Sequence, residues 1–521
     1  MPPRRKDPII YERHTGAASI PLPATYRRRE PEHTILYRVV QEHLHTFLAQ
    51  ARDQNSNGYG MPSFIEREFT RYLECGVLAG NGFVRVHCDD CGHDRLVAFS
   101  CKNRSVCPSC CARRMHDFSA HLVDRVFPQN IPVRQWVLAL PKWIRFKLAY
   151  QPKLVTQVLQ IFLCAIFSWQ RLCARRSGIA DGKPGAVTVI QRFGSAINLN
   201  VHLHVLVVDG VFVEQGDAAE FVALKAPSDA EVEAVARKVA RRVLALIKRC
   251  EENTETIVDE SADPYFKSVL ESQRKITLAT DGHDPPIKRG RRSAFLQGFS
   301  IHANVAVGAN KRDALEKLAR YCARPPIALS RLAASSDGMR LSYRLKHRAP
   351  GTPELLYMTP LELLEKLSAI IPPPRMHVFR YHGCFAPNSK MRARIIPRPA
   401  AEIGSAAEEK QSPDREPRVD LTWTPPRPRR LDWASLLARV FKIDVLQCDR
   451  CGGRMRVIAF ITDPDVTRAI LTCLGLPTVA PAANPARDPP QLELPAGVVD
   501  HDGPVDFAPQ DGIDIIVDGD A

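Results

Sequence analysis

The stretch INLNVHLHVLVVDG, residues 197–210, decides the fold, because it predicts a buried strand with two histidines in its middle. Side chains of a strand point alternately to opposite faces, so His202 and His204 share one face while the apolar residues around them share the other. Asn198 and Asn200 continue the histidine face toward the start of the strand. The two imidazoles converge on one spot, where they fit a metal ion and a packed polar pair equally well.

Strands and helices follow one another irregularly around this stretch. Apolar alternation and helical periodicity predict strands at 133–140, 185–194 and 294–308, and helices at 154–169, 229–251 and 310–324, with two more helices within 32–76. Mixed elements without regular strand–helix–strand units indicate an α+β domain on an antiparallel sheet that is flanked by helices.

The charge distribution favours a polyanionic partner. The chain of 521 residues has a net charge of +15, and residues 488–521 hold nine acidic side chains and no Lys or Arg, so the preceding part carries +24. Such a charge attracts nucleic acid through the release of counterions, although a well-solvated basic surface has the same composition.

The sequence argues against a membrane or secreted protein. The first residues lack the apolar stretch of a signal peptide, and the apolar run at 154–169 is short for a membrane span and is interrupted by Gln157 and Gln160. Fifteen cysteines without a secretion signal indicate a reducing compartment, where Cys-x-x-Cys pairs bind metal or carry out redox chemistry. We therefore expect a cytoplasmic protein.

Two Cys-x-x-Cys pairs stand close together between residues 88 and 110. Each pair forms a tight turn that offers two thiolates, and two such turns close a tetrahedral zinc site without an open position for a substrate water. The predicted ligands of this structural zinc are Cys88, Cys91, Cys107 and Cys110. A ligand exchange stays open, and the spare candidates are Cys101, Cys111, His87 and His93. The basic residues beside the module, such as Arg104, suit contacts with a DNA backbone.

A third pair, Cys448 and Cys451, stands alone near the other end of the sequence. Only Cys473 and His501 follow it as further donors. The pair fits two interpretations equally well, a relic knuckle with incomplete ligation and a turn stabilised by the two glycines that follow it.

These patterns divide the chain into six predicted segments. They are an N-terminal helical region (1–80), a zinc-ribbon-like module (81–116), the α+β domain (117–395), a disordered linker rich in Pro, Arg and Glu (396–430), a small unit with the third cysteine pair (431–475) and an acidic disordered tail (476–521).

A tyrosine stands near the end of the helix predicted at 310–324. Lys317 precedes Tyr321 by one turn, and Arg320 and Arg324 are its close neighbours in sequence. Positive charge nearby favours the phenolate that a nucleophile requires, and the same cations suit phosphate binding. A solvated helix face is the alternative interpretation of the three cations.

Four blocks of the sequence together resemble the rolling-circle insertion-sequence transposases of the His-hydrophobe-His (HUH) class. The blocks are the leading cysteine cluster, GAVTVIQRFGSAINLNVHLHVLVVDGVF (185–212), IHANVAVGANKRDALEKLARYCARPPIALSRL (301–332) and PPPRMHVFRYHGCFAPNSKMR (372–392). They occur in the family's order, so the resemblance covers about residues 35–395, and CDRCGGRMRVIAFI (448–461) matches as well.

The resemblance implies roles for the residues described above. His202 and His204 match the family's metal-binding histidines, Tyr321 matches its catalytic tyrosine, and the four predicted zinc ligands match its zinc-binding module. Members with two catalytic tyrosines carry the other one four residues earlier, where this chain has Lys317. The resemblance therefore implies a one-tyrosine enzyme of the common-region type.

The resemblance also implies a chemistry. Mg²⁺ or Mn²⁺, held by the two histidines and a third ligand, would polarise a scissile phosphate while Tyr321 attacks single-stranded DNA, which leaves a 5′-phosphotyrosine and a free 3′-hydroxyl. We expect His302 as the third ligand, with Asn198 or Asn200 behind it; a polar core histidine is the alternative for His302. The expected partners are single-stranded element ends and target DNA, and the expected place is the nucleoid in a bacterial cytoplasm.

Three rival interpretations share parts of this pattern. A replication initiator or relaxase has the same nicking chemistry. A non-catalytic, zinc-dependent DNA-binding regulator binds DNA without forming a covalent adduct. A decayed copy of a mobile element folds but does not cut.

Overall fold

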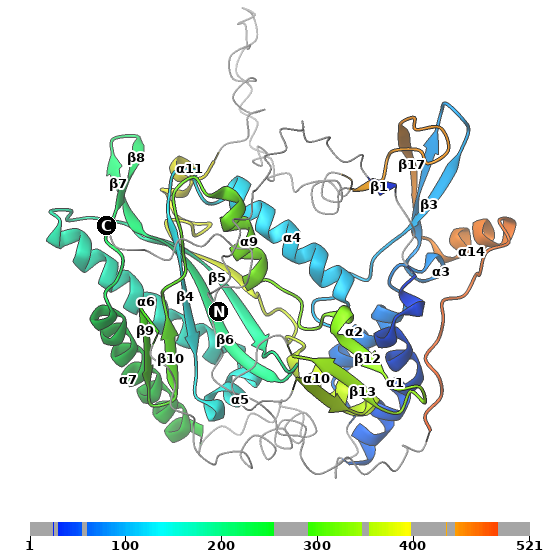
Figure 1. Cartoon of the computed structure of the whole chain (residues 1–521), viewed down its shortest axis with the longest axis horizontal. Coiled ribbons are helices and arrows are strands. Elements are labelled where there is room, and N and C mark those ends of the chain that lie inside the picture. The colour runs from blue at the N-terminus through cyan, green and yellow to red at the C-terminus, as the bar shows by residue number, and fades with distance from the viewer. Residues whose placement is uncertain are drawn as a thin grey trace, which may run out of the picture.

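The computed structural model of the chain describes residues 24–25, 30–54, 60–254, 290–345, 354–397, 434 and 443–487. It confirms the predicted α+β class, because helices surround an antiparallel sheet (Figure 1). The predicted linker (396–430) lies outside the described residues from residue 398 onward, and the predicted tail (476–521) does so from residue 488 onward.

The central sheet has seven strands, and each of its pairs is antiparallel. Its strand order is β15-β5-β6-β4-β10-β9, and β11 also pairs with β4. The strands are β4 (Val133–Ala139), β5 (Gly185–Phe193), β6 (Leu199–Val208), β9 (Ser293–Leu296), β10 (Phe299–His302), β11 (Ala306–Val307) and β15 (Phe379–Gly383). Long buried runs of β-branched residues explain why β4, β5 and β6 lie at the centre.

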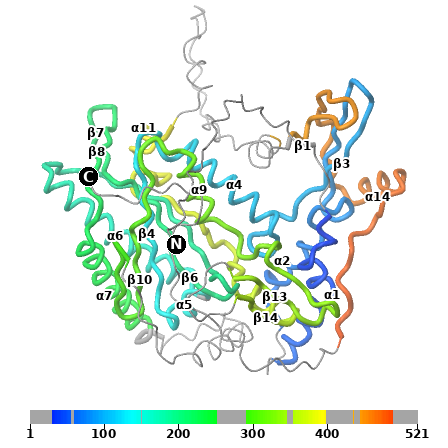
Figure 2. Tube along the Cα trace, viewed as in Figure 1, coloured from blue at the N-terminus to red at the C-terminus, as the bar shows by residue number. Residues whose placement is uncertain are grey.

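The two faces of this sheet pack against different helices. Helices α6 (Pro152–Arg176) and α7 (Asp229–Thr254) cover the face that carries Val201, Leu203 and Val205, and these residues belong to the largest apolar core. Helices α4 (Pro108–Arg125) and α9 (Arg312–Cys322) cover the opposite face, which carries the histidines and a second core. Figure 2 shows α4 beside α9 and α6 beside α7. We call the second surface the histidine face.

The predicted strand at 294–308 is wrong as one continuous strand. It consists of the hairpin β9–β10 and the short β11. Gln297 and Gly298 have positive φ values of 53° and 78°, as the two central residues of a tight hairpin turn require. The pattern of apolar residues continues through the turn, so periodicity alone does not reveal it.

The N-terminal region confirms the two helices predicted within 32–76, as α1 (Ile35–Asp53) and α2 (Ser63–Leu73). Helix α10 (Pro360–Ile370) packs on α1. It begins with a capping box in which the Thr359 side chain accepts from Glu362 N, and the Glu362 carboxylate accepts from the N–H of Thr359.

The remaining described elements are smaller. They are α3 (Leu78–Asn81), α5 (Lys142–Tyr150), α11 (Arg392–Ile395), α14 (Pro464–Cys473), η1 (Pro31–His33), η2 (Leu329–Arg331), β1 (Ala24–Thr25), β2 (Phe83–Cys88), β3 (Asp94–Ala98), β7 (Gly210–Gln215), β8 (Ala218–Ala223), β12 (Leu332–Ala334), β13 (Leu341–Arg344), β14 (Leu355–Met358), β16 (Ile443–Asp444) and β17 (Met455–Ile461).

Segments from the C-terminal part of the described chain pack against its N-terminal region. Strand β17 pairs with β2, which forms the three-stranded sheet β17-β2-β3. Residues 476–487 run beside α1, where Asn484 N donates to Gln41 O (2.7 Å) and Arg487 N donates to the Thr46 hydroxyl (2.9 Å). The prediction of a disordered tail is therefore wrong for residues 476–487.

Helix α6 is the predicted apolar helix. By length and composition it is the one described helix that could cross a membrane. Its side chains Phe162, Ile166 and Trp169 are buried in the core beneath the sheet, and core helices share this length and composition.

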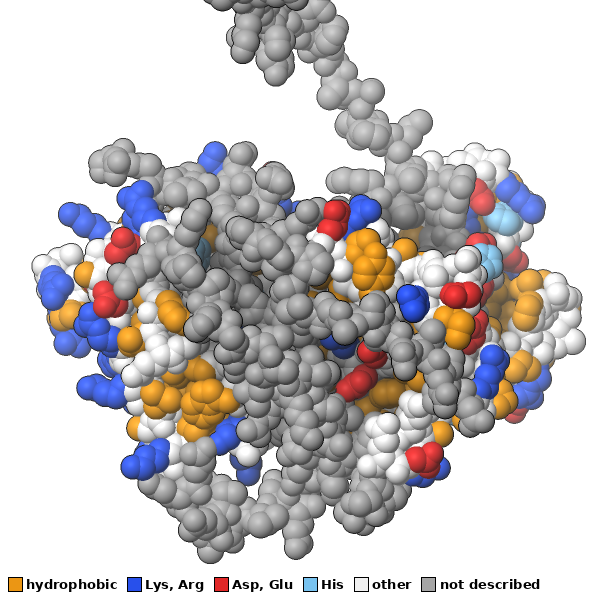
Figure 3. Space-filling view, turned by 60° about the horizontal axis from the view of Figure 1, so that its bottom comes forward, with side chains coloured by type: hydrophobic (Ala, Val, Ile, Leu, Met, Phe, Trp, Pro, Cys, Tyr) orange, Lys and Arg blue, Asp and Glu red, His pale blue; other side chains and the backbone are white. Residues whose placement is uncertain are grey.

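Basic side chains gather on the outer side of α6 and α7. The exposed residues there are Arg171, Arg175, Arg176, Arg237, Arg241, Arg242, Lys248 and Arg249. Figure 3 shows Lys and Arg side chains along this side of the molecule (left). A surface of this kind attracts a polyanion.

Candidate active site and cysteine clusters

The histidine pair lies in the middle of β6, as the alternation predicts. Both side chains point to the histidine face, and their ring centroids are 4.8 Å apart. Burial is nearly complete, because His202 is 2% and His204 is 1% exposed. The two rings therefore lie inside the protein, beneath α9.

Tyr321 meets this pair from the last turn of α9. Its ring centroid lies 5.9 Å from that of His204, and the two rings are almost perpendicular, at 85°. Helix α9 ends at Cys322, three residues before Pro325, which cannot continue a helix. A residue 117 positions after His204 is thus brought to the same place.

The hydrogen bond of His202 fixes its tautomer. Nδ1 of His202 lies 2.9 Å from the carbonyl oxygen of Asn200, which only accepts, so Nδ1–H donates and Nε2 keeps a lone pair. Burial lowers the pKa of His202 to about 3 and lowers the pKa of His204 well below its ordinary value. Neutral imidazole is the form that binds metal.

His204 contacts an amide side chain on the neighbouring strand. The Gln135 amide lies 2.8 Å from Nδ1 of His204 and 3.2 Å from Sγ of Cys322. The Gln135 side chain thereby fixes the orientation of the His204 ring.

Gln191 is a site residue that we did not predict from the sequence. It lies on β5, directly opposite His202 in register, and its side chain is 3% exposed. Its Nε2 donates to the carbonyl oxygens of Tyr321 (3.3 Å) and Cys322. Its Oε1 is buried and has no hydrogen-bond partner among the described residues. A polar residue within the apolar strand GAVTVIQRFG is the sequence signal that could have revealed it.

Asn200 offers a second oxygen on the same face. The residue is 3% exposed, and its Oδ1 has no hydrogen-bond partner within the described part of the chain. Two buried amide oxygens thus accompany the two imidazoles, and buried polar atoms of this kind need a ligand, an ion or a water.

His302 does not join the pair. In the register of the sheet, Val137 of β4 separates His302 of β10 from His204 of β6. Two strand spacings place the two backbones about 9.5 Å apart. Accordingly, the ligand atoms of the three histidines do not all lie within 4.8 Å of one another. The structure therefore does not bring His302 together with the pair, as the prediction of a third ligand required.

The three predicted cations differ in their surroundings. The Arg324 guanidinium lies 5.5 Å from the Tyr321 ring centroid and 5.5 Å from that of Phe193, and burial lowers its pKa. Its Nε is buried without a hydrogen-bond partner in the described chain. Lys317 is exposed on α9, and Arg320 acts electrostatically on His116 of α4. Arg324 is thus the cation that lies against the tyrosine.

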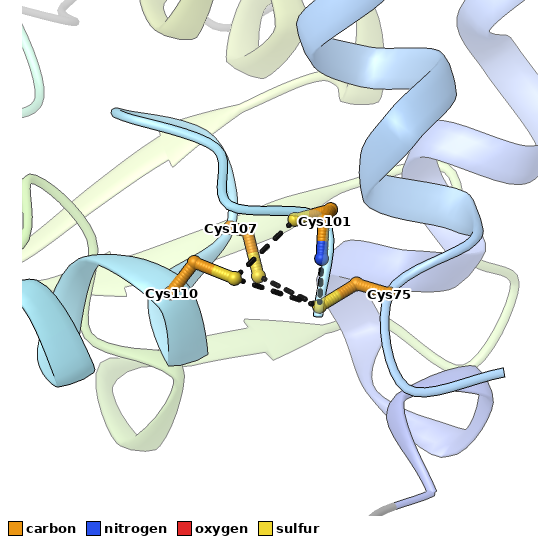
Figure 4. Close-up of side chains that lie close together, drawn as sticks. All are labelled: Cys75, Cys101, Cys107 and Cys110. Atoms are coloured by element: carbon orange, nitrogen blue, oxygen red, sulfur yellow. Dashed lines mark hydrogen bonds between the residues drawn. The ribbon is translucent and has the colours of Figure 1, made fainter. Parts of the chain in front are cut away.

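The first cysteine cluster consists of Cys75, Cys101, Cys107 and Cys110, and all four are buried (Figure 4). We call it cluster one. The Sγ–Sγ distances are 3.7 Å for Cys75–Cys110, 3.4 Å for Cys101–Cys110 and 3.5 Å for Cys75–Cys107. Thiolates around a zinc ion stand about 3.8 Å apart, since Zn–S bonds are about 2.3 Å and the geometry is tetrahedral. Cluster one fits a closed zinc site.

The second cluster consists of Cys88, Cys91, Cys448 and Cys451, and we call it cluster two. The predicted quartet of zinc ligands is therefore wrong as one site, because the structure assigns two of its cysteines to each cluster. The spare candidate Cys101 is a member of cluster one, and so is Cys75, which the Cys-x-x-Cys pattern did not indicate. The interpretation of Cys448 and Cys451 as an incomplete set of ligands is also wrong, because Cys88 and Cys91 complete the group of four. The predicted turn is present, with Gly452 N donating to Cys448 O (3.0 Å).

Cluster one is linked directly to the site. Cys107 is the N-cap of α4, and Cys110 lies in its first turn. Helix α4 then packs along α9, which carries Tyr321. Arg104, expected to contact DNA, instead donates to the carbonyl oxygens of Pro372, Pro373 and Met376 at 2.9–3.1 Å, and so ties the module to the segment before β15.

Two family models match the chain. A model described as a transposase zinc-binding domain matches residues 39–140, which include all of cluster one, and this match supports a structural zinc there. A model described as a putative transposase matches residues 185–393, which include β5, β6 and α9. Both matches follow the chain in the order that the resemblance predicts.

One relative is similar over most of both chains. The transposase for insertion sequence element IS801 of Pseudomonas savastanoi pv. phaseolicola is 22% identical over 396 residues, which are 75% of this chain and 83% of the relative. No solved structure matches the chain. The chain belongs to the family of insertion-sequence transposases that carry an N-terminal transposase zinc-binding domain.

Proposed function

We propose that this transposase cuts and rejoins single-stranded DNA by a rolling-circle route, with Tyr321 as the nucleophile of an HUH-type site. The observation that carries the proposal is the meeting of Tyr321 with His204, at 5.9 Å between ring centroids, beside the second buried imidazole of His202. The arrangement depends on both elements, because Tyr321 belongs to α9 and the two histidines belong to β6.

The residues present fit a catalytic divalent ion. His202 and His204 supply neutral imidazoles, and the buried Oε1 of Gln191 is the oxygen ligand that we propose in place of His302. Two imidazoles with oxygen ligands suit Mn²⁺ and accept Mg²⁺. Such an ion, when bound, supplies Lewis-acid polarisation of a phosphate oxygen.

The protein's own groups carry the remaining steps. The Tyr321 oxygen attacks the scissile phosphorus and forms a P–O bond, the bond to the 3′ oxygen breaks, and the phenol proton ends on that oxygen. The products are a 5′-phosphotyrosine and a free 3′-hydroxyl. The buried Arg324 guanidinium stabilises the charge of the phosphate, because it lies against the same ring. Attack of the 3′-hydroxyl on the phosphotyrosine reseals the strand without a nucleotide cofactor.

A single tyrosine does the chemistry in this proposal. Lys317 stands one turn before Tyr321 on α9, where a two-tyrosine enzyme has its second phenol, and it is exposed. A cation there suits binding of the DNA backbone beside the cut. The enzyme would act on the DNA of the bacterial nucleoid.

The test incubates the full chain with labelled single-stranded oligonucleotides from element ends, in Mn²⁺ or Mg²⁺. We expect a denaturation-resistant protein–DNA band, with the label retained when it lies 3′ of the cut, because the 5′ phosphate is bound to the protein. A chain that binds these oligonucleotides but forms no band in either metal is a DNA-binding regulator or an inactive copy, and the proposal is then wrong.

Gln191→Leu tests the proposed third ligand. We expect the rate of adduct formation to fall about 10- to 100-fold and the Mn²⁺ concentration for half-maximal rate to rise, because an oxygen ligand is lost. Gln191→Glu keeps an oxygen at this place but loses the amide donor to Tyr321 O and Cys322 O. It should keep the metal dependence near that of the wild type. Equal metal dependence in the wild type and the Leu variant would leave Gln191 a purely structural role.

A further inference from the structure

We propose that cluster two binds a second zinc ion, and that this ion fastens residues 443–473 to the N-terminal module. We call residues 443–473 the C-terminal unit. Cys448 and Cys451 lie outside both ranges matched by the family models, whereas Cys88 and Cys91 lie within the range of the zinc-binding domain. The inference goes beyond the proposed function, because the number of bound zinc ions does not depend on DNA cleavage.

The four thiols of cluster two have the geometry of a zinc site. Sγ of Cys88 lies 3.5 Å from that of Cys451, and Sγ of Cys91 lies 3.6 Å from that of Cys448. These distances are close to the tetrahedral edge of about 3.8 Å and far longer than the bond of about 2.05 Å in a disulfide. Each Cys-x-x-Cys turn thus contributes both of its sulfurs to one centre.

The two turns have the same backbone. Cys88 N donates to His93 O (2.9 Å) and Gly92 N donates to Cys88 O (2.9 Å) in the first turn. In the second turn the corresponding bonds are Cys448 N to Gly453 O (2.9 Å) and Gly452 N to Cys448 O (3.0 Å). Gly92 and Gly452 both have positive φ, at 70° and 75°, which glycine adopts without strain. Two matching turns are the usual framework of a zinc ribbon.

Reciprocal ion pairs hold the two turns in register. Arg456, just after the second turn, lies 2.8 Å from the carboxylate of Asp89 in the first turn. Arg95, just after the first turn, lies 2.7 Å from the carboxylate of Asp449 in the second turn. Each turn therefore supplies the acid that binds the arginine of the other.

The apolar core under this sheet is small. It consists of six buried residues, namely Val84, Val86, Cys88, Val97, Cys448 and Met455. Two of these are themselves members of cluster two. Small units with a core of this size depend on a metal or on disulfides, because the apolar area they bury does not offset the loss of chain entropy.

A zinc count tests the proposal. Zinc is measured by elemental analysis of the full chain in a His202→Ala/His204→Ala background, which removes the imidazoles of the nuclease site. We expect two zinc ions per chain when all cysteines are present and one when Cys448→Ser/Cys451→Ser is added. The matched control is Cys473→Ser, since Cys473 is an exposed cysteine of the same unit outside both clusters. This control should keep two ions.

A second experiment tests the fastening itself. A protease site is inserted between Glu409 and Lys410, and an affinity tag is placed on the N-terminal part. After cleavage we expect the C-terminal fragment to stay with the tagged part in zinc buffer and to elute when a chelator is added. In the double serine variant the fragment should elute without the chelator.

The outcomes separate the proposal from a purely protein-based contact. One zinc ion when all cysteines are present, or two when the double serine change is added, overturns it. Retention of the fragment in chelator, with cluster two emptied, overturns the fastening role. A failure of the DNA-cutting assay changes none of these results, so the two proposals fail separately.

Discussion

Tyr321→Phe should abolish the covalent protein–DNA adduct and lower the rate of strand cleavage at least about a thousandfold, because removal of a nucleophile leaves only binding and electrostatic effects. The phenyl ring keeps its place beside His204 and Arg324, at 5.9 Å and 5.5 Å between the groups, so the fold and the affinity for single-stranded DNA should change little. The measurements are denaturing gel electrophoresis of the adduct and a fluorescence-anisotropy titration of the same oligonucleotide.

Tyr381→Phe is the matched control for this variant. Tyr381 also lies beside an arginine and a histidine, with Arg392 at 5.4 Å and His121 at 6.3 Å from its ring. It lies on β15, two strands from the histidine pair. We expect normal adduct formation from Tyr381→Phe. An adduct that persists in Tyr321→Phe and disappears in Tyr381→Phe would transfer the nucleophilic role to the other tyrosine.

Cys110→Ser should be the most damaging single change to stability. The residue is buried in cluster one, and its loss removes a zinc ligand and the anchor of the first turn of α4. Loss of a structural metal site costs about 4 kcal/mol or more, which lowers the melting temperature by about 10 °C in a domain of this size. Calorimetry with a parallel zinc measurement should show both losses together.

Cys111→Ser is the control for this effect. Cys111 is the next residue of α4 and is buried to the same extent, with 6% exposure for each, but it belongs to neither cluster. A buried hydroxyl in its place costs about 1–3 kcal/mol and leaves the zinc bound. If the two variants lose equal stability and keep equal zinc, cluster one is only a packed group of thiols.

The alternation rule predicted the centre of the fold correctly. Side chains alternate regularly between two faces along the run VHLHVLVV. This alternation predicted the strand, its two faces and the convergence of His202 and His204 without knowledge of a partner strand. The α+β class and the helices at 154–169 and 310–324 follow from equally regular patterns. A sequence is regularly periodic when every residue on one face of an element packs against the core, and this is the case in these segments.

Pairings between distant segments were not predictable in the same way. Cys107 and Cys110 lie nearer in sequence to Cys91 than to Cys75, and local spacing therefore favoured the wrong quartet. The sequence did contain a signal for the pairing in cluster two, because Cys88-Asp-Asp-Cys-Gly and Cys448-Asp-Arg-Cys-Gly share the pattern Cys-Asp-x-Cys-Gly. The position of Gln191 beside the histidine pair follows only from the register of β5 against β6, which places it opposite His202.

The pairing of β17 with β2 has a consequence for biosynthesis. It joins residues 455–461 to residues 83–88, so the three-stranded sheet is completed only after most of the chain has left the ribosome. A product that terminates before residue 448 keeps the edge of β2 without its partner strand and leaves Cys88 and Cys91 as a solitary dithiol. Synthesis of residues 455–461 is therefore the step that allows the N-terminal module to be completed.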